Sequence, residues 1–401
     1  MIYNKDNHFI ISSITKNLLV LLILLSFQNV FAKKTILKKY HPVYSYPSKL
    51  GFDVDLQIGK VWKHTTNFRP TINGPSYCGE VNVFKQTDGS KAWQRKLHYP
   101  EIGGGFWFAV HHDRDTIGNA FAAYIYWKYS FVRSKVVDFN MKMGIGLAYA
   151  TKKFTKGSNE VHNAIGAHLN AYVQLRFGLE WKIAKPLRLV TAFTYNHYSD
   201  GAVKLPNLGI NTMCGTIGLI YYPNIEKYKL ELNKDSIPKP KKKNEIFAKA
   251  TVGFLDVKNN LIPEKTYLMQ STTIGYSRYL NITNKLSMGT TLEFNFGEPY
   301  IYVNTLEVQN KKIKKAATDL SVFIGDEIMI GHVGFYFQLG AYLYHAYRVP
   351  LPVTFRLGAN LYASNKLGKK KRGAIFGTGG LKAHGATAQL IEVGAGGAWK
   401  F

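Results

Sequence analysis

A histidine and a serine two residues apart are the side chains in this sequence best placed to do chemistry. They lie in the segment 195–211, which reads Tyr-Asn-His-Tyr-Ser-Asp-Gly-Ala-Val-Lys-Leu-Pro-Asn-Leu-Gly-Ile-Asn. Residues two apart on an extended strand project from the same face, so His197 and Ser199 can stand side by side. The imidazole could then take the hydroxyl proton as the serine attacks an ester carbonyl, and return it to the leaving group. A bare pair of this kind is, however, far more often a histidine beside a serine-bearing turn than a catalytic unit.

A catalytic histidine also needs a partner that fixes its tautomer, and Asn211 is the candidate for this role. The strand that leads to the pair has mainly apolar odd-numbered residues, which would face lipid: Leu187, Leu189, Thr191, Phe193 and Tyr195. His197 and Ser199 continue this odd-numbered face. Asn211 begins the returning strand, whose odd-numbered residues are again largely apolar. We therefore expect the three side chains on one outer face, near the rim of a sheet.

The turn between these two strands supplies candidate donors for the oxyanion that forms during acyl transfer. The backbone at Gly201 or Ala202 and the side chain of Asn207 are the best candidates. Asp200 adjoins the pair, but it would point to the opposite face if the strand continued through it. The sequence implies no metal or cofactor, because it has only two cysteines and no H-E-x-x-H motif.

Strands that alternate between apolar and polar residues must position this segment. In residues 51–62 and 165–177, apolar residues occupy one face and mainly polar or small residues the other. Period two is typical of strands, and an apolar face of membrane-spanning length predicts an all-β transmembrane barrel. On this pattern His168, Gln174 and Arg176 would line the lumen. A soluble β-sandwich could alternate in the same way and is the minority alternative.

The strand candidates fall into two sets, separated by a basic, proline-bearing linker at residues 223–245. The first set lies near residues 50–62, 75–86, 100–111, 118–131, 136–149, 163–179, 185–199 and 211–222. The second lies near residues 246–257, 268–281, 284–297, 318–330, 332–345, 353–363, 376–384 and 387–401. The sequence is compatible with an eight-stranded barrel in residues 33–222 followed by a second barrel-like unit in 246–401. One antiparallel barrel of about sixteen strands is equally compatible.

The amino end has the pattern of a signal peptide. Lys5 and Lys16 precede the apolar run 18–27, and Ala32 is the expected last residue of the segment 1–32 that would be removed. A retained anchor is the alternative, although the run is short for a spanning helix. The terminal Phe401 closes an alternating strand and looks like the insertion signal read by the barrel assembly machinery. We therefore expect an integral protein of the bacterial outer membrane.

The formal net charge of +27 would ordinarily suggest nucleic-acid binding. Export and the barrel pattern argue against a nucleic-acid partner. Instead, we expect lysines and arginines in loops such as residues 311–315 and 369–372, either as solvated turns or in contact with lipopolysaccharide phosphates. Cys78 and Cys214 could pair in an exported protein, but the sequence does not place them together.

The segment 195–211 resembles the active-site region of the lipid A 3-O-deacylase family. The matching residues are His197, Tyr198, Ser199, Gly201, Lys204, Pro206, Asn207 and Gly209. The resemblance implies an eight-stranded outer-membrane barrel with its site on the lipid-facing wall. The family usually has a glutamate where this chain has Asn211, whereas longer acyloxyacyl hydrolase-like relatives use asparagine. The motif covers about 187–222 and the barrel resemblance 50–222, and residues 246–401 carry no recognised catalytic motif.

Taken together, these features predict a serine esterase that removes an ester-linked acyl chain from lipid A of lipopolysaccharide. Ser199 would be the nucleophile, His197 the general base and acid, and Asn211 the residue that orients the histidine. The expected partners are lipopolysaccharide and outer-membrane lipid, and the oligomeric state stays open. The alternative is a non-enzymatic barrel, such as a pore, an adhesin or a structural protein, that retains a vestigial motif.

Overall fold

The protein was analysed as a computed structural model. It describes residues 50–223, 235–241, 243–259, 262–297, 315–346, 352–363, 372–384 and 387–401. The expected signal peptide at 1–32, most of the linker 223–245 and nearly all of both lysine-rich loops lie outside these residues. Among the described residues, no helix has both the length and the hydropathy needed to cross a membrane.

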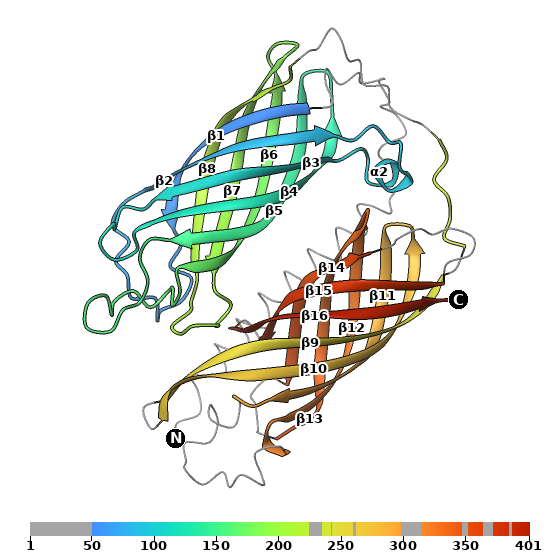
Figure 1. The fold of residues 1–401 in the computed structure, drawn as a ribbon. Coiled ribbons are helices and arrows are strands. Elements are labelled where there is room, and N and C mark those ends of the chain that lie inside the picture. The colour runs from blue at the N-terminus through green and yellow to red at the C-terminus, as the bar shows by residue number, and fades with distance from the viewer. Residues whose placement is uncertain are drawn as a thin grey trace, which may run out of the picture.

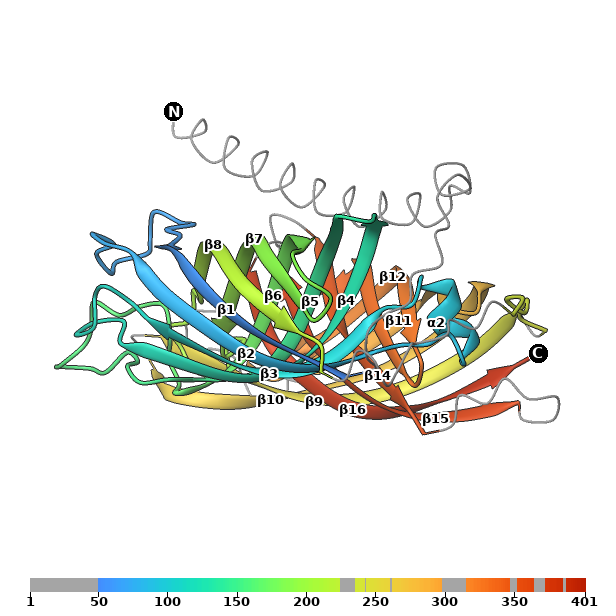
Figure 2. The same ribbon diagram turned by 90° about the horizontal axis from the view of Figure 1, so that it is seen from above.

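The described strands form two closed, antiparallel barrels of eight strands each, which lie side by side (Figures 1 and 2). The first consists of β1 (Leu50–Val61), β2 (Ser76–Gln86), β3 (Glu101–Val110), β4 (Asn119–Arg133), β5 (Val137–Ala150), β6 (Leu169–Lys182), β7 (Leu187–Ser199) and β8 (Ile210–Tyr221). The second consists of β9 (Asn244–Asn259), β10 (Ile262–Asn281), β11 (Asn284–Asn295), β12 (Thr318–Ile330), β13 (Val333–His345), β14 (Val353–Tyr362), β15 (Gly373–His384) and β16 (Thr387–Lys400). A short helix, α2 (Ala92–Lys96), lies in the β2–β3 connection.

Barrel closure decides between the two architectures that the sequence allowed. β1 pairs with both β2 and β8, and β9 pairs with both β10 and β16. Each set of eight strands therefore closes on itself, which confirms the predicted all-β barrel and excludes one sixteen-stranded barrel. The second barrel closes next to the chain end, where the Phe401 N–H donates to the Asn244 carbonyl at 2.9 Å.

The predicted alternation is visible along β1. Val54, Leu56 and Ile58 are more than half exposed on the outer wall, whereas Asp53 and Asp55 are buried in the lumen. An apolar exterior and a polar interior suit a barrel surrounded by lipid. Large apolar side chains that would be unfavourable in water can remain on the outer wall, because lipid covers this wall in a membrane.

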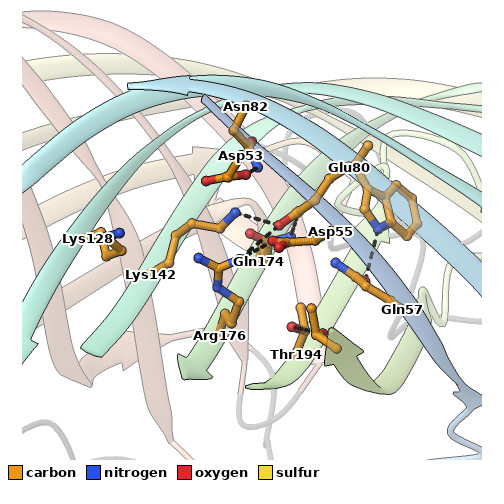
Figure 3. A network of polar contacts seen from close by, with 12 residues as sticks. Asp53, Asp55, Gln57, Glu80, Asn82, Lys128, Lys142, Gln174, Arg176 and Thr194 are labelled. Carbon is orange, nitrogen blue, oxygen red and sulfur yellow. Dashed lines mark hydrogen bonds and ion pairs between the residues drawn. The ribbon is translucent and has the colours of Figure 1, made fainter. Parts of the chain in front are cut away.

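A network of buried polar side chains lies in the lumen of the first barrel (Figure 3). Glu80 lies at the centre, 2.6 Å from Lys142 Nζ, 2.6 Å from Gln174 Nε2 and 3.3 Å from an Arg176 nitrogen. Arg176 also pairs with Asp55. An eight-stranded barrel is only wide enough for its own side chains, and buried carboxylates need cationic partners.

The second lumen is filled in the same way. Lys285 Nζ lies 2.7 Å from Glu245 and 3.1 Å from Glu327. A cavity of about 20 Å³ remains beside them, enough for about one water molecule. The expectation that basic residues gather in loops is therefore incomplete, because several of them neutralise carboxylates inside the barrels.

The start of β6 differs from the prediction. The strand begins at Leu169 and not near 163, and Ile165 is fully buried in the preceding loop instead of facing lipid. The Phe154 N–H donates to the Ile165 carbonyl at 2.7 Å, so this loop folds back on itself. His168 precedes the strand and stacks on the Tyr149 ring at 5.4 Å between centroids, so it does not line the lumen. Gln174 and Arg176 do line it.

Candidate active site

Ser199, His197 and Asn211 form a continuous chain of hydrogen-bonding contacts. His197 Nε2 lies 3.0 Å from Ser199 Oγ, and His197 Nδ1 lies 2.7 Å from Asn211 Oδ1. His197 and Asn211 are directly opposite each other in the β7–β8 register. The structure thus brings the three predicted site residues together in the order of a nucleophile, a base and an orienting residue.

These three side chains belong to the outer wall of the first barrel. Along β7 they continue the face of Phe193, which is 50% exposed, and on β8 they continue the face of Ile217, which is 57% exposed. Ser199 is only 9% exposed and Asn211 only 5% exposed, although both lie on this outer face. The site is therefore sheltered from bulk solvent by neighbouring chain segments while its face remains that of the lipid-facing wall.

Two further side chains fix the amide of Asn211. The Tyr195 hydroxyl donates to Asn211 Oδ1 at 2.5 Å, and Asn211 Nδ2 donates to His64 Nδ1 at 2.8 Å. With its oxygen turned towards His197, the amide accepts a hydrogen bond from the Nδ1–H of that ring. The other ring nitrogen, Nε2, is then free to accept the Ser199 hydroxyl proton.

Sequence reasoning assigned no site role to Tyr195 or to His64. Tyr195 is two residues before His197 on the same strand face, so the period-two pattern could have identified it. His64 follows β1, and it reaches Asn211 because β1 and β8 close the barrel. The Trp62 N–H donates to the Asn211 carbonyl at 2.8 Å, which extends this closure to the site. Only the barrel topology could reveal that His64 belongs to the site.

Gly209 is required by the position of the imidazole. Its φ of +77° is in the left-handed region, and a Cβ at this residue would lie 2.6 Å from His197 Cε1. Its N–H donates to the Ala164 carbonyl at 2.9 Å, which ties the β7–β8 turn (residues 200–209) to the loop before β6. The glycine in the motif therefore serves close packing against the catalytic candidate.

The candidate oxyanion donors differ in their availability. The Ala202 N–H already donates to Asp200 Oδ1 at 3.0 Å, which argues against this donor. The Gly201 N–H makes no hydrogen bond within the part of the chain that the structure describes. The Asp200 N–H donates to Asn207 Oδ1 at 3.2 Å, so the Asn207 amide nitrogen can serve a ligand. Gly201 and Asn207 remain the better candidates.

Asp200 lies in the turn and not on the inner face, because β7 ends at Ser199. The side chain is 3% exposed, and burial raises the pKa of its carboxyl to about 6. Its Oδ1 accepts the Ala202 N–H, so its role in the structure is to shape the turn.

The inner side of the site is anchored through Tyr198, which points into the barrel between His197 and Ser199. Its hydroxyl lies 3.0 Å from His111 Nε2, and His111 Nδ1 lies 2.9 Å from Ser76 Oγ. Burial lowers the pKa of His111 to about 4, so this ring is neutral at neutral pH. This contact fixes the end of β7 and thereby the direction in which the site residues project.

An acidic cluster in the first lumen deserves comparison with a metal site. The cluster consists of Asp53, Asp55 and Glu80, which place one possible ligand atom each within 4.8 Å of one another. Among the described residues, it is the group of three acidic, histidine or cysteine side chains that could hold a metal ion. Arg176 and Lys142 already contact these carboxylates. Cations of the protein thus neutralise Asp55 and Glu80, and the cluster belongs to the lumen network.

The fold and the site define an outer-membrane barrel with a serine–histidine–asparagine arrangement on its outer wall. Residues 79–219 match the family model described as lipid A 3-O-deacylase (PagL), and residues 246–401 match the model of the acyloxyacyl hydrolase C-terminal domain. Together the two models match well over half of the chain. Residues 79–219 thus belong to the lipid A 3-O-deacylase family, and residues 246–401 correspond to the C-terminal domain of acyloxyacyl hydrolases.

Three of the solved structures to which this chain is similar each cover less than half of it. Neisserial surface protein A is 10% identical over 43% of this chain and 97% of its own, with a TM-score of 0.32. The outer membrane enzyme PagL is 16% identical over 41% of this chain and 97% of its own, with a TM-score of 0.31. The barrel domain of Pseudomonas aeruginosa OprF is 9% identical over 43% and 98%, with a TM-score of 0.27. A search of curated protein sequences gives no significant match.

Proposed function

We propose that this protein is a serine esterase of the outer membrane that removes an ester-linked acyl chain from lipid A of lipopolysaccharide. The observation that carries the proposal is the contact chain from Ser199 through His197 to Asn211 on the outer wall of the barrel. The match of residues 79–219 to the lipid A 3-O-deacylase family supports the same substrate class.

In the first half-reaction, Ser199 Oγ attacks the ester carbonyl carbon while its proton passes to His197 Nε2. The tetrahedral intermediate collapses, the bond to the sugar oxygen breaks, and Nε2 returns the proton to that oxygen. The acyl chain is then attached to Ser199. In the second half-reaction, water attacks this ester while His197 Nε2 takes its proton. The bond to Ser199 Oγ then breaks, Nε2 returns the proton to Oγ, and the free fatty acid leaves.

Asn211 would hold the Nδ1 proton of His197 so that Nε2 faces the serine. Unlike a carboxylate, the neutral amide does not place a negative charge beside the imidazolium that forms during attack. The Tyr195 hydroxyl keeps the amide oxygen in place from the other side. This arrangement supports proton transfer with orientation and a neutral hydrogen bond, and with less electrostatic stabilisation than a glutamate would give.

The negative oxygen of the tetrahedral intermediate needs donors near Ser199. The Gly201 N–H and the Asn207 side-chain amide are the available groups in the β7–β8 turn, and such donors typically contribute about 3 kcal/mol each to transition-state stability. The lipid-facing wall next to the site offers apolar contact to an acyl chain through side chains such as Val173, which is 38% exposed and opposite His197.

We further propose that the chain reaches this location after removal of residues 1–32 and that the barrel assembly machinery recognises the strand ending at Phe401. The alternative is a non-enzymatic barrel, such as a pore, an adhesin or a structural protein, and as a pore it has less support. The lumen of each barrel is filled by its own ion pairs, such as Lys142 with Glu80 and Lys285 with Glu245. An aqueous channel would require an open lumen.

The test is mass spectrometry of lipid A from cells that express the full-length protein or its Ser199→Ala variant at equal levels. The wild type should produce lipid A that is lighter by one acyl chain, and the variant should not. Unchanged lipid A with correctly inserted wild-type protein would contradict the proposed substrate. Loss of the same chain with the Ser199→Ala variant would contradict the proposed nucleophile.

A further inference from the structure

A carboxylate stands on the outer wall of the second barrel, where lipid-facing residues are expected. Along β9 the outward residues are Ile246, Ala248, Ala250, Val252 and Phe254, and the next outward residue is Asp256. Phe254 is 51% exposed, whereas Asp256 is only 1% exposed. Charge on the lipid face of a barrel is unfavourable, so a buried carboxylate in this row calls for a partner. The first barrel supplies it.

The β7–β8 turn of the first barrel lies over Asp256. The Leu205 N–H donates to Asp256 Oδ2 at 3.0 Å, and the Asp256 N–H donates to the Ala202 carbonyl at 3.4 Å. Lys204 Nζ also lies 3.8 Å from Asp256 Oδ1, but the lysine side chain is 53% exposed, so solvent screens this ion pair. One residue of the second barrel thus contacts the turn at two backbone points.

The turn also packs against apolar side chains of the second barrel. A Cβ at Gly201 would collide with Ile391 on β16 and would lie 3.3 Å from Leu381 on β15. These two outward residues are paired in the β15–β16 register, so they form one contact surface. Gly201 has a φ of +64°, which a side chain would strain as well. The backbone of a candidate oxyanion donor therefore rests directly on the second barrel.

We propose that the second barrel completes the active site and that Asp256 is a positioning residue for the turn that binds the oxyanion. The inference rests on the proposed esterase function and extends it to residues 246–401, which carry no catalytic motif. Asp256 acts through the backbone of Ala202 and Leu205, which both lie within the turn next to Ser199. It does not itself touch the substrate.

The physical reason is that oxyanion donors act only when they are held in place before the reaction. A shift of about 1 Å in such a group can cost about a hundredfold in rate. The turn has two successive residues in the left-handed region, Gly201 and Ala202, so its conformation depends on external contacts. A contact that fixes the transition-state donors changes kcat more than KM.

Three full-length variants test this inference. Each is assayed by the release of fatty acid from purified lipopolysaccharide in detergent micelles. Asp256→Ala removes the acceptor for the Leu205 N–H, and Asp256→Asn keeps an oxygen there. Asp326→Ala is the matched control, since Asp326 is a carboxylate of the same barrel whose Oδ1 accepts a hydrogen bond from Asn284 Nδ2 at 2.6 Å. The variants are compared by kcat per folded protein. The amount of folded protein is measured on a gel, from the band with native, heat-modifiable mobility.

Asp256→Ala should lower kcat by roughly tenfold to a hundredfold with KM changed less than threefold. Asp256→Asn should retain at least a third of the wild-type kcat, and Asp326→Ala should match the wild type. Equal kcat for wild type and Asp256→Ala would overturn the inference, and so would an equal loss with Asp326→Ala. The rescue by asparagine is the readout that a general loss of folding would not give.

Hydrogen exchange separates this inference from the proposed function. Peptides that cover residues 200–208 should exchange faster in Asp256→Ala than in the wild type, with the asparagine variant close to the wild type. Wild-type protein that releases no fatty acid would contradict the proposed esterase and this inference with it. Active wild type with unchanged exchange and unchanged kcat in Asp256→Ala would contradict the positioning role alone.

Discussion

Replacing Asn211 by alanine should lower turnover while leaving measurable activity. The substitution removes the oxygen that lies 2.7 Å from His197 Nδ1 and 2.5 Å from the Tyr195 hydroxyl. The His197 ring keeps its contact with Ser199 Oγ at 3.0 Å, so the nucleophile and base remain paired. What is lost is the control of tautomer and ring orientation.

The size of the effect follows from the hydrogen bonds that disappear. A buried donor left without its partner costs about 1–3 kcal/mol, and about 1.4 kcal/mol corresponds to a tenfold change in rate. Asn211 is 5% exposed, so water has little access to replace the amide. We therefore expect Asn211→Ala to reduce kcat by roughly ten- to a hundredfold. Loss of Ser199 or His197 should reduce it by several powers of ten.

A carboxylate at the same position should be tolerated or beneficial. Asn211→Asp keeps the shape of the side chain and offers a charge-assisted hydrogen bond, which is about twice as strong as a neutral one. Its cost is the lost donor to His64 Nδ1, now 2.8 Å from Asn211 Nδ2, so that His64 must change tautomer. Asn211→Glu, with the residue usual in the family, carries the same charge on a longer side chain and should also retain activity.

The assay is fatty acid release from lipopolysaccharide micelles, with the same substitutions repeated in a His197→Ala background. Because Asn211 acts through His197, Asn211→Ala should have almost no further effect there. Full activity of Asn211→Ala would show that another residue orients the histidine. An equal loss in both backgrounds would show that Asn211 acts independently of the histidine.

Three further substitutions, together with one glycine control, probe the surroundings of the site. Tyr195→Phe should lower kcat less than tenfold, because Asn211 keeps its contacts with both histidines; a larger kinetic loss would give the hydroxyl a direct role. Gly209→Ala should abolish more than 99% of the fatty acid release, because its Cβ would meet the His197 ring. Gly215→Ala is the control and should remain active, because a Cβ there has no atom closer than 3.9 Å. Equal activities of the two variants would argue against the packing role of Gly209. Burial raises the pKa of Asp200 to about 6 from 3.8, so the folded protein holds this proton more tightly. The contribution of Asp200 to the free energy of unfolding should therefore fall as pH rises from about 4 to 6. Asp200→Asn should therefore resist urea better than the wild type at pH 8, by at most about 3 kcal/mol, but not at pH 4; a pH-independent difference would contradict this linkage.

The strands could be predicted because a barrel in lipid repeats its pattern every two residues. All sixteen predicted strands correspond to strands in the described part of the chain, with most boundaries within a few residues. The face shared by His197, Ser199 and Asn211 followed from the same alternation. The number of barrels did not, because closure depends on which strand pairs with β1, and that contact joins Val61 to Thr212 far along the chain.

The parts of the site that escaped prediction arise from contacts between distant segments. His64 reaches Asn211 only through barrel closure, and Asp256 meets the β7–β8 turn only because the two barrels lie side by side. The segment 163–168 had the alternation of a strand but forms a loop, because Ile165 is buried beneath the rim. The interior lysines resembled surface charges until the lumen showed their carboxylate partners.

The central claim is that Ser199 is a nucleophile activated by His197, and covalent labelling tests it most directly. Full-length protein in detergent micelles is treated with a long-chain alkyl fluorophosphonate, which reacts with activated serines, and the labelled peptide is identified by mass spectrometry. The account predicts one phosphonyl group on Ser199, which is lost in Ser199→Ala and greatly slowed in His197→Ala. Labelling of another residue, or an equal labelling rate in the His197→Ala variant, would contradict it.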